Sequence, residues 1–106
     1  MRRFASLRRQ SDFARLRRRG RRINAATFTA FRGERRPGES LPVVGITVAK
    51  AVGNAVVRNR LRRRIAAILN ECLDPARPEQ ILIVARPSAA GLAFPVLRSQ
   101  VLAALP

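Results

Sequence analysis

The chain has 106 residues, and its 22 lysines and arginines against six acidic residues give a net charge of +16 at pH 7. That length suits one domain with its own core, for which 47% of the residues are hydrophobic. The excess charge predicts a polyanionic partner, with nucleic acid as the leading class. The absence of histidine excludes imidazole bases and histidine metal sites.

A short helix is predicted over residues 11–20, SDFARLRRRG, with Ser11 as its N-cap and Gly20 as its end. Phe13 and Leu16 lie three residues apart and form a narrow apolar stripe, and arginines fill most of the remaining surface. We therefore expect this helix to be solvated or to face RNA rather than to be fully buried.

Alternation predicts two strands next, over residues 24–32 (NAATFTAFR) and 42–50 (PVVGITVAK), joined by a loop rich in glycine and proline. In the second strand every other residue is a large aliphatic, and most of the residues between are small. If these strands pair, the small residues lie beside Phe31. The sheet then has one core face and one shallow face with a single aromatic ring and few bulky aliphatics.

A long amphipathic helix is predicted from Asn54 to Leu73. At about 100° per residue, its apolar positions form one stripe: Val57, Leu61, Ile65, Ile68 and Cys72. The five arginines of RNRLRRR, residues 58–64, lie on or beside the opposite face, with no glutamate four residues away to neutralise them. Because a solvated face would leave this repulsion uncompensated, we predict that it docks on a nucleic acid backbone.

The remaining segments predict a short central strand, QILIVAR over residues 80–86, and a last helix, FPVLRSQVLAALP over residues 94–106, with Pro95 in its first turn. No repeat or linker interrupts the chain. We expect one RNA-binding domain over residues 1–106, with residues 1–10 as the segment where disorder is expected.

Groups that carry out reactions are scarce. The six acids are spread over loops and helix ends, so their spacing does not require the paired carboxylates of a two-metal nuclease. One cysteine cannot build a zinc site, and no glycine-rich phosphate loop occurs. We therefore predict no catalytic residue and no metal ligand in the polypeptide, and no small-molecule substrate.

The single cysteine, Cys72, fits a reducing compartment, and we expect a cytoplasmic protein. No apolar run approaches the roughly 20 residues that span a bilayer, so no membrane partner is expected. The opening MRRFASLRRQS also has the composition of a transit peptide, but Asp12 interrupts it and the basic pattern continues into segments predicted to fold.

The stretch VGITVAKAVGNAVVRNRLRRRI, residues 44–65, resembles the signature region of the bacterial ribonuclease P protein component, whose helix carries an RNR motif after a strand. SLRRQSDFARLRRRG upstream and ILIVARPSAAGLAF downstream match in the same order, so the resemblance covers nearly the whole chain. Three ordered blocks are far more specific than a lone RNR.

The resemblance implies a protein cofactor of an RNA enzyme. In that family the RNA subunit, using Mg²⁺ that it mainly holds itself, removes the 5′ leader from precursor tRNA, so the implied partners are RNase P RNA and precursor tRNA. The catalytic RNA would contact the RNR helix and its approach at Lys50, Asn54, Arg58, Asn59, Arg60, Arg62 and Arg63. The leader would lie in a cleft between the first helix and the sheet, lined by Phe13, Arg17, Phe31 and Thr47.

The fold that the resemblance implies is α+β: a single-domain α/β sandwich in the order αβββαβα, with a four-stranded sheet and a left-handed β-α-β crossover. This order adds a short strand near residues 21–23 that pattern alone does not predict. The sequence departs from the family where Ala51 and Ala66 replace common basic residues and Arg17 replaces a common aromatic.

Two rival functions share this size and charge. One is a ribosomal or other structural RNA-binding protein with no part in cleavage, and the other is an autonomous nuclease. The missing histidines and the unclustered acids count against the nuclease. Stimulation of precursor-tRNA cleavage by the catalytic RNA would separate the first rival from an RNase P subunit.

Overall fold

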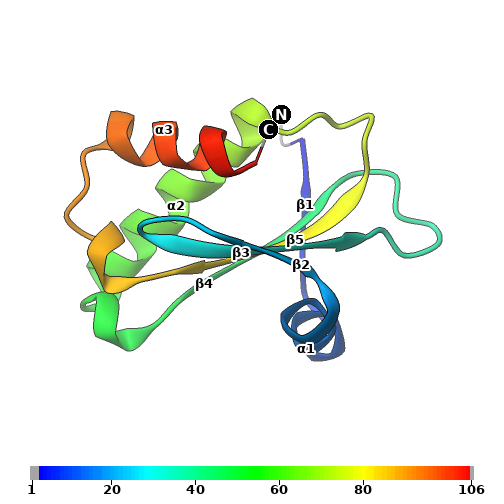
Figure 1. Cartoon of the computed structure of the whole chain (residues 1–106), viewed down its shortest axis with the longest axis horizontal. Helices are drawn as coiled ribbons and strands as arrows, with labels where there is room; N and C mark the ends of the chain where they lie inside the picture. Colours follow the sequence, from blue (N-terminus) through cyan, green and yellow to red (C-terminus); the bar gives the residue numbers. More distant parts are fainter. Residues whose placement is uncertain (1–2, 106) are drawn as a thin grey trace.

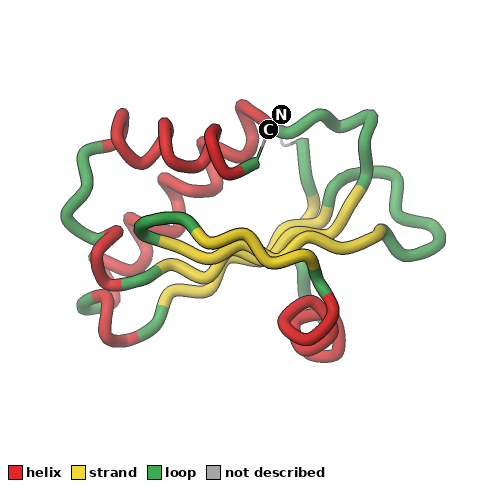
Figure 2. Tube along the Cα trace, in the orientation of Figure 1, coloured by secondary structure: helices red, strands yellow, loops and turns green. Residues whose placement is uncertain are grey.

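A computed structural model describes residues 3–105. The chain forms three layers, with helix α1 (Gln10–Arg19) on one face of a sheet and helices α2 (Ala55–Cys72) and α3 (Phe94–Ala104) on the other (Figure 1). Two short helical turns, η1 (Lys50–Val52) and η2 (Pro87–Ala89), precede α2 and α3. The strands cross between the helical layers (Figure 2) and are β1 (Ala5–Ser6), β2 (Arg21–Asn24), β3 (Phe28–Glu34), β4 (Val43–Val48) and β5 (Glu79–Ala85).

The sheet has five strands in the order β1-β4-β5-β3-β2. The predicted α+β sandwich is confirmed, including the short strand near residues 21–23, but the predicted count of four strands is wrong. The additional strand, β1, is two residues long and pairs in parallel with β4, a length too short to show any sequence period. The segment β4-α2-β5 is the expected β-α-β unit, because β4 and β5 are parallel neighbours; the hand of its crossover stays a prediction.

The position of β5 corrects the expected pairing. Strands β3 and β4 do not pair, because the apolar β5 lies between them and is buried on both faces. Phe31, Leu82 and Gly45 therefore form one row across the sheet. Thr29, Val84 and Thr47 form the next row on the same face. The expectation of a face with few bulky aliphatics is wrong, since β5 contributes Leu82 and Val84 to it.

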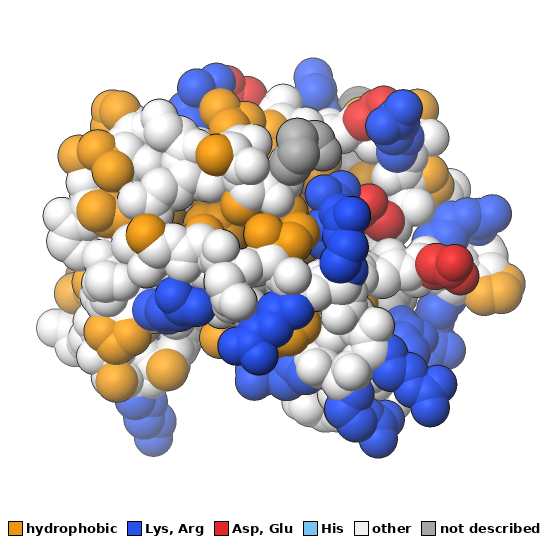
Figure 3. All heavy atoms as spheres, viewed as in Figure 1, with side chains coloured by type: hydrophobic (Ala, Val, Ile, Leu, Met, Phe, Trp, Pro, Cys, Tyr) orange, Lys and Arg blue, Asp and Glu red, His pale blue; other side chains and the backbone are white. Residues whose placement is uncertain are grey.

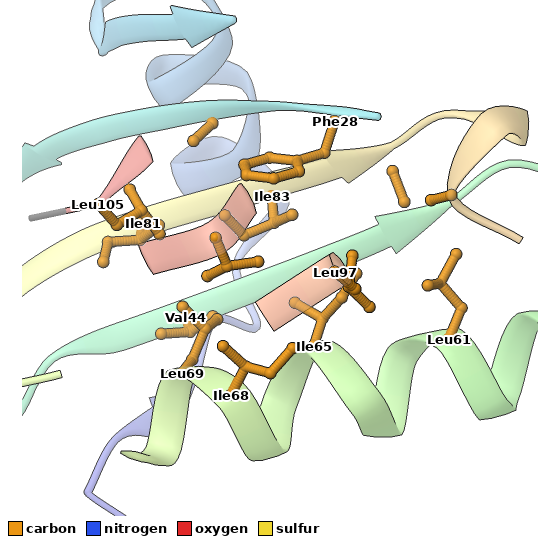
Figure 4. Packing of buried hydrophobic residues seen from close by; sticks show 14 of the residues in the cluster. Phe28, Val44, Leu61, Ile65, Ile68, Leu69, Ile81, Ile83, Leu97 and Leu105 are labelled. Atoms are coloured by element: carbon orange, nitrogen blue, oxygen red, sulfur yellow. The ribbon is translucent and has the colours of Figure 1, made fainter. Parts of the chain in front are cut away.

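The main core lies between the sheet and helices α2 and α3 (Figure 4). The predicted apolar stripe of α2 is confirmed at its three central residues, which are 4% exposed or less: Leu61, Ile65 and Ile68. Val57 and Cys72, at the two ends of that stripe, are half-buried and pack against the same core. The other side of α2 is thereby turned away from the sheet, where it is free to carry charge.

A smaller cluster fixes α1 to the opposite face of the sheet, and its buried members are Leu7, Leu16, Phe31, Val43 and Leu82. Residues 1 and 2, part of the segment for which disorder was expected, lie outside the described residues. Residues 3–10 include β1, and Phe4 and Leu7 within them are buried.

The predicted C-terminal end of α1 is confirmed, and the predicted N-cap is wrong. Gly20 follows the last turn as expected, and its N–H donates to the Leu16 carbonyl at 2.9 Å. Ser11 is not the N-cap, because the helix begins at Gln10 and Arg9 occupies the cap position without a side-chain hydrogen bond. Ser11 is exposed within the first turn, whereas Asp12 beside it is buried in contacts described below.

Candidate nucleic-acid interface

The start of α2 is built by a local cap. The Asn54 side-chain oxygen accepts a hydrogen bond from the Val57 N–H at 3.0 Å and so caps the helix, while the amide NH₂ remains available to donate to a ligand. Lys50 is exposed in η1, one short turn earlier. The positive end of the helix dipole lies at the same place, which adds to the charge of Lys50 and of the arginines that follow.

The arginine face of α2, defined here as Arg58, Arg60, Arg62, Arg63 and Arg64 with Asn59, points away from the core. Asn59, Arg60 and Arg63 are exposed, while Arg58, Arg62 and Arg64 are half-buried at its edges. Arg62 donates to the Asn59 side-chain oxygen at 2.7 Å, which holds two members of the face together.

Two edge arginines have roles that the sequence did not reveal. Arg64 donates to the Leu92 carbonyl at 3.2 Å and so links α2 to the segment before α3. The Nε atom of Arg58 is buried without a hydrogen-bond partner among the residues that the structure describes. Arg64 is therefore partly occupied by the protein and Arg58 is partly buried, so Arg60 and Arg63 are the members most open to a ligand.

The acidic residues neutralise arginines elsewhere. Ion pairs join Arg15 and Arg36 to Asp12, Arg32 to Glu79, Arg77 to Asp74 and Arg98 to Glu71. Within residues 3–105, no arginine of the α2 face forms an ion pair. Five guanidinium groups on about two helical turns thus keep their charge uncompensated, as the spacing of the sequence predicted.

A hollow of about 420 Å³ lies between α1 and β4, and its lining is Gln10, Phe13, Ala14, Arg17 and Thr47. The structure therefore brings together three of the four residues predicted for the leader cleft: Phe13, Arg17 and Thr47. Phe13 is half-buried, Arg17 is exposed, and Thr47 donates to the Ile83 carbonyl at 3.4 Å. The hollow offers one aromatic ring beside one guanidinium.

Phe31 does not line this hollow. It is only 8% exposed and packs in the cluster beneath α1, and the Arg22 guanidinium carbon lies 5.8 Å from its ring centroid. Alternation placed Phe31 on the correct face of the sheet. Tertiary packing places Phe31 in the row of the sheet that α1 covers. Its ring therefore supports α1 and is not accessible to a ligand.

A buried polar network locks α1 to the sheet, and sequence reasoning missed it. Asp12 is 3% exposed, and its Oδ1 accepts from Arg36 Nε at 2.6 Å and lies 3.2 Å from Arg15 Nη2. Arg15 also donates to the fully buried Gln80, whose Nε2 donates to the Glu39 carboxylate at 3.2 and 3.3 Å. The available signal was a glutamine at the start of an otherwise apolar strand.

The cysteine and the acidic side chains within residues 3–105 do not form a metal-binding or catalytic cluster at the α2 face or at the hollow between α1 and β4. No group of three or more cysteine and acidic side chains within residues 3–105 could hold a metal ion. Cys72 is half-buried at the end of α2, and burial raises the pKa of its thiol, which favours the protonated form. No helix in the same part of the chain is long and apolar enough to cross a membrane.

An uncompensated arginine face and an aromatic hollow on a small α+β scaffold define an RNA-binding protein. The sequence matches the model of the Ribonuclease P family over residues 1–106. The chain belongs to the ribonuclease P protein family, the protein component of the endoribonuclease RNase P.

Known relatives support this assignment along most of the chain. The chain is 38% identical over 96 residues to the ribonuclease P protein component of Acidothermus cellulolyticus, and this match covers 89% of this chain and 79% of that protein. It is 38% identical over 106 residues to the corresponding protein of Thermobifida fusca, covering 93% and 72%. The fold is similar to that of the Staphylococcus aureus RNase P protein, with a TM-score of 0.85 at 22% identity over 94% of this chain and 91% of that chain. The predicted family and its role as an RNase P subunit are confirmed, which sets aside the structural RNA-binding rival.

Proposed function

We propose that this protein docks the catalytic RNA of RNase P on the arginine face of α2 and holds the single-stranded 5′ leader of precursor tRNA in the hollow between α1 and β4. The observation that carries this proposal is the distribution of charge. Four of the six acids form ion pairs with arginines outside the α2 face, and none pairs with that face within residues 3–105, so the net charge of +16 includes a concentrated and unpaired site for phosphates.

The α2 face suits a folded RNA. Arg60 and Arg63 lie three residues apart on the exposed side of the helix, and residues at that spacing are neighbours on a helix surface. Their planar guanidinium groups match phosphate oxygens through paired donors. The rigid core beneath α2 limits the side-chain and backbone ordering that RNA binding must otherwise supply.

The hollow suits an unpaired strand. Phe13 offers a ring on which a base can stack, a contact worth about 1–3 kcal/mol per base, and Arg17 offers a charge for the adjacent phosphate. Thr47 of β4 lines the same hollow with a small polar side chain. Because Phe31 is buried, we assign leader contacts to Phe13, Arg17 and Thr47 only.

In this proposal the RNA subunit holds the Mg²⁺ that hydrolysis requires. The protein contributes positive charge, which reduces the repulsion between two RNA molecules and so lowers the Mg²⁺ concentration at which they associate. We also propose that the protein acts in the cytoplasm, the compartment that its single half-buried thiol fits.

Reconstitution tests this function. Catalytic RNA at low Mg²⁺ should cleave precursor tRNA faster when the protein is added, and polylysine at equal charge should not reproduce the full stimulation. Equal stimulation by polylysine, or none by the protein, would contradict the proposal. Cleavage by the purified protein without RNA would instead support the nuclease alternative.

A further inference from the structure

A second hollow, of about 380 Å³, lies between α1 and the loop that joins β3 to β4, and its lining includes Arg15, Arg19, Arg35 and Arg36. Arg15 and Arg19 lie on the side of α1 opposite Phe13 and Arg17, as the helical rotation of about 100° per residue requires. In Figure 3 the blue side chains gather at the lower right, over α1 and this loop. The hollow is therefore separate from the leader hollow and from α2.

Two glycines let the walls of this hollow approach each other. A methyl group at Gly33 would come within 2.8 Å of Leu16 Cδ2, and one at Gly20 within 3.2 Å of Phe31 Cβ. Leu16, at 1% exposure, thus rests directly on β3 and forms the apolar floor. The close contact brings the arginines of α1 to face those of the loop.

The four arginines are held in different ways. Arg15 and Arg36 share the buried Asp12, which fixes their position while leaving several N–H groups of each directed elsewhere. Arg19 forms no ion pair within residues 3–105, and Arg35 donates only to the Glu39 carbonyl at 3.2 Å. Glu34 is the single acid in the lining, and Asp12 pairs with Arg15 and Arg36 from outside it. Four positive charges are thus opposed by two negative charges, which leaves the hollow positive.

We propose that this hollow binds a backbone phosphate of RNA, as a third contact beside the α2 face and the leader hollow. Fixed guanidinium groups on two walls, over an apolar floor that limits water, are suited to a tetrahedral anion. RNA is favoured over a free anion as the natural ligand because exposed arginines of α1 continue the positive surface beyond the hollow. In naming RNA, the inference rests on the proposed function.

Titration with inorganic phosphate, followed by the amide NMR signals of the isotope-labelled protein, tests the site directly. The amides of Gly20, Gly33 and Arg35 should shift together and saturate. Arg19→Ala and Arg35→Ala should each weaken this binding about tenfold, as the loss of one charge-assisted hydrogen bond predicts. Glu34→Gln should strengthen it, because a like charge is removed.

Arg18→Ala is the matched control. Arg18 and Arg19 are both exposed in the last turn of α1, but only Arg19 lines the hollow. Unsaturable shifts at these amides, or equal weakening by Arg18→Ala and Arg19→Ala, would overturn the proposal, since they indicate only the general field of a basic protein.

The RNA arm separates this inference from the proposed function. Arg19→Ala and Arg35→Ala should lower affinity for the catalytic RNA or the precursor tRNA more than Arg18→Ala does, which would identify RNA as the source of the phosphate. Phosphate binding with unchanged affinity for both RNAs would overturn the RNA assignment. If stimulation of cleavage fails while the phosphate site saturates, the proposed function fails independently of the site.

Discussion

The ring of Phe13 lies directly against Gly45, where a methyl group would come within 2.9 Å of the ring atom Cε1. The missing side chain on β4 is what lets the ring descend to the sheet and present an edge to the hollow beside Thr47. The position of the one open aromatic ring in the proposed leader site therefore depends on a glycine in a neighbouring strand.

Replacing the two phenylalanines should have different effects. Phe13→Ala should weaken binding of leader-bearing precursor tRNA by about 1–3 kcal/mol, the value of one stacked base, and should affect mature tRNA little. Phe31→Ala should instead lower the free energy of unfolding by about 3–5 kcal/mol, because it empties a buried site. Equilibrium binding and urea unfolding measure the two quantities. Equal losses for precursor and mature tRNA in Phe13→Ala would contradict the leader assignment.

Removing both Arg60 and Arg63 should weaken binding to the catalytic RNA and flatten its salt dependence. If each neutralises one phosphate, the slope of log affinity against log salt should fall by about 1.4 to 1.8. The double lysine variant keeps the charge and should retain most of the slope while losing the affinity that comes from paired donors. An unchanged slope in the alanine variant would mean that these arginines do not contact phosphates.

Asp12→Ala should loosen α1 from the sheet. The substitution leaves the partly buried Arg15 and Arg36 without their shared acceptor, and we expect the free energy of unfolding to fall by about 1–3 kcal/mol. Leader binding should weaken in parallel, since α1 carries Phe13. Asp74→Ala is the control, because its pair with Arg77 is exposed and spans 4.0 Å. A comparable loss of stability in both variants would argue against a special role for the buried acid.

Acid should weaken the contact between α2 and α3. The hydrogen bond from Arg98 lowers the pKa of Glu71 below its ordinary value, so the ionised form is stabilised in the folded state. This stabilisation is present above the ordinary pKa and is lost as the pH falls through the lowered value. Glu71→Gln should therefore show a shallower decline of stability across the acidic range. Thermal unfolding at a series of pH values measures this decline, and an identical decline in both proteins would exclude the effect.

The parts of the structure that could be predicted are those with a local pattern. The α2 face follows from helical spacing alone, since Leu61 and Ile65 define the buried side and the arginines must lie opposite. Strand β1 could not be predicted, because two residues carry no alternation and its pairing with β4 depends on Phe4 and Leu7 finding buried positions.

For the candidate site, the sequence could predict only which face of its own helix or strand each residue lies on. Alternation assigned Phe31 to the same face as the hollow, but it cannot say which row of that face α1 covers. Gln80 and Asp12 are separated by most of the chain, and Arg15 links them only because β5 lies between β3 and β4. Long-range pairing of this kind leaves no trace in local periodicity.

The order of the strands also sets the order in which the protein can assemble. β5 is the last strand in the sequence and the central one in the sheet, so β1 with β4 and β2 with β3 have no bridge until residues 79–85 have been synthesised. Pairings of this long range are slow to form. The nascent chain therefore carries its five-arginine helix before it has the core that orients it. Under the proposed function, translation must therefore reach the final strand and helix before the arginine face is oriented for its RNA.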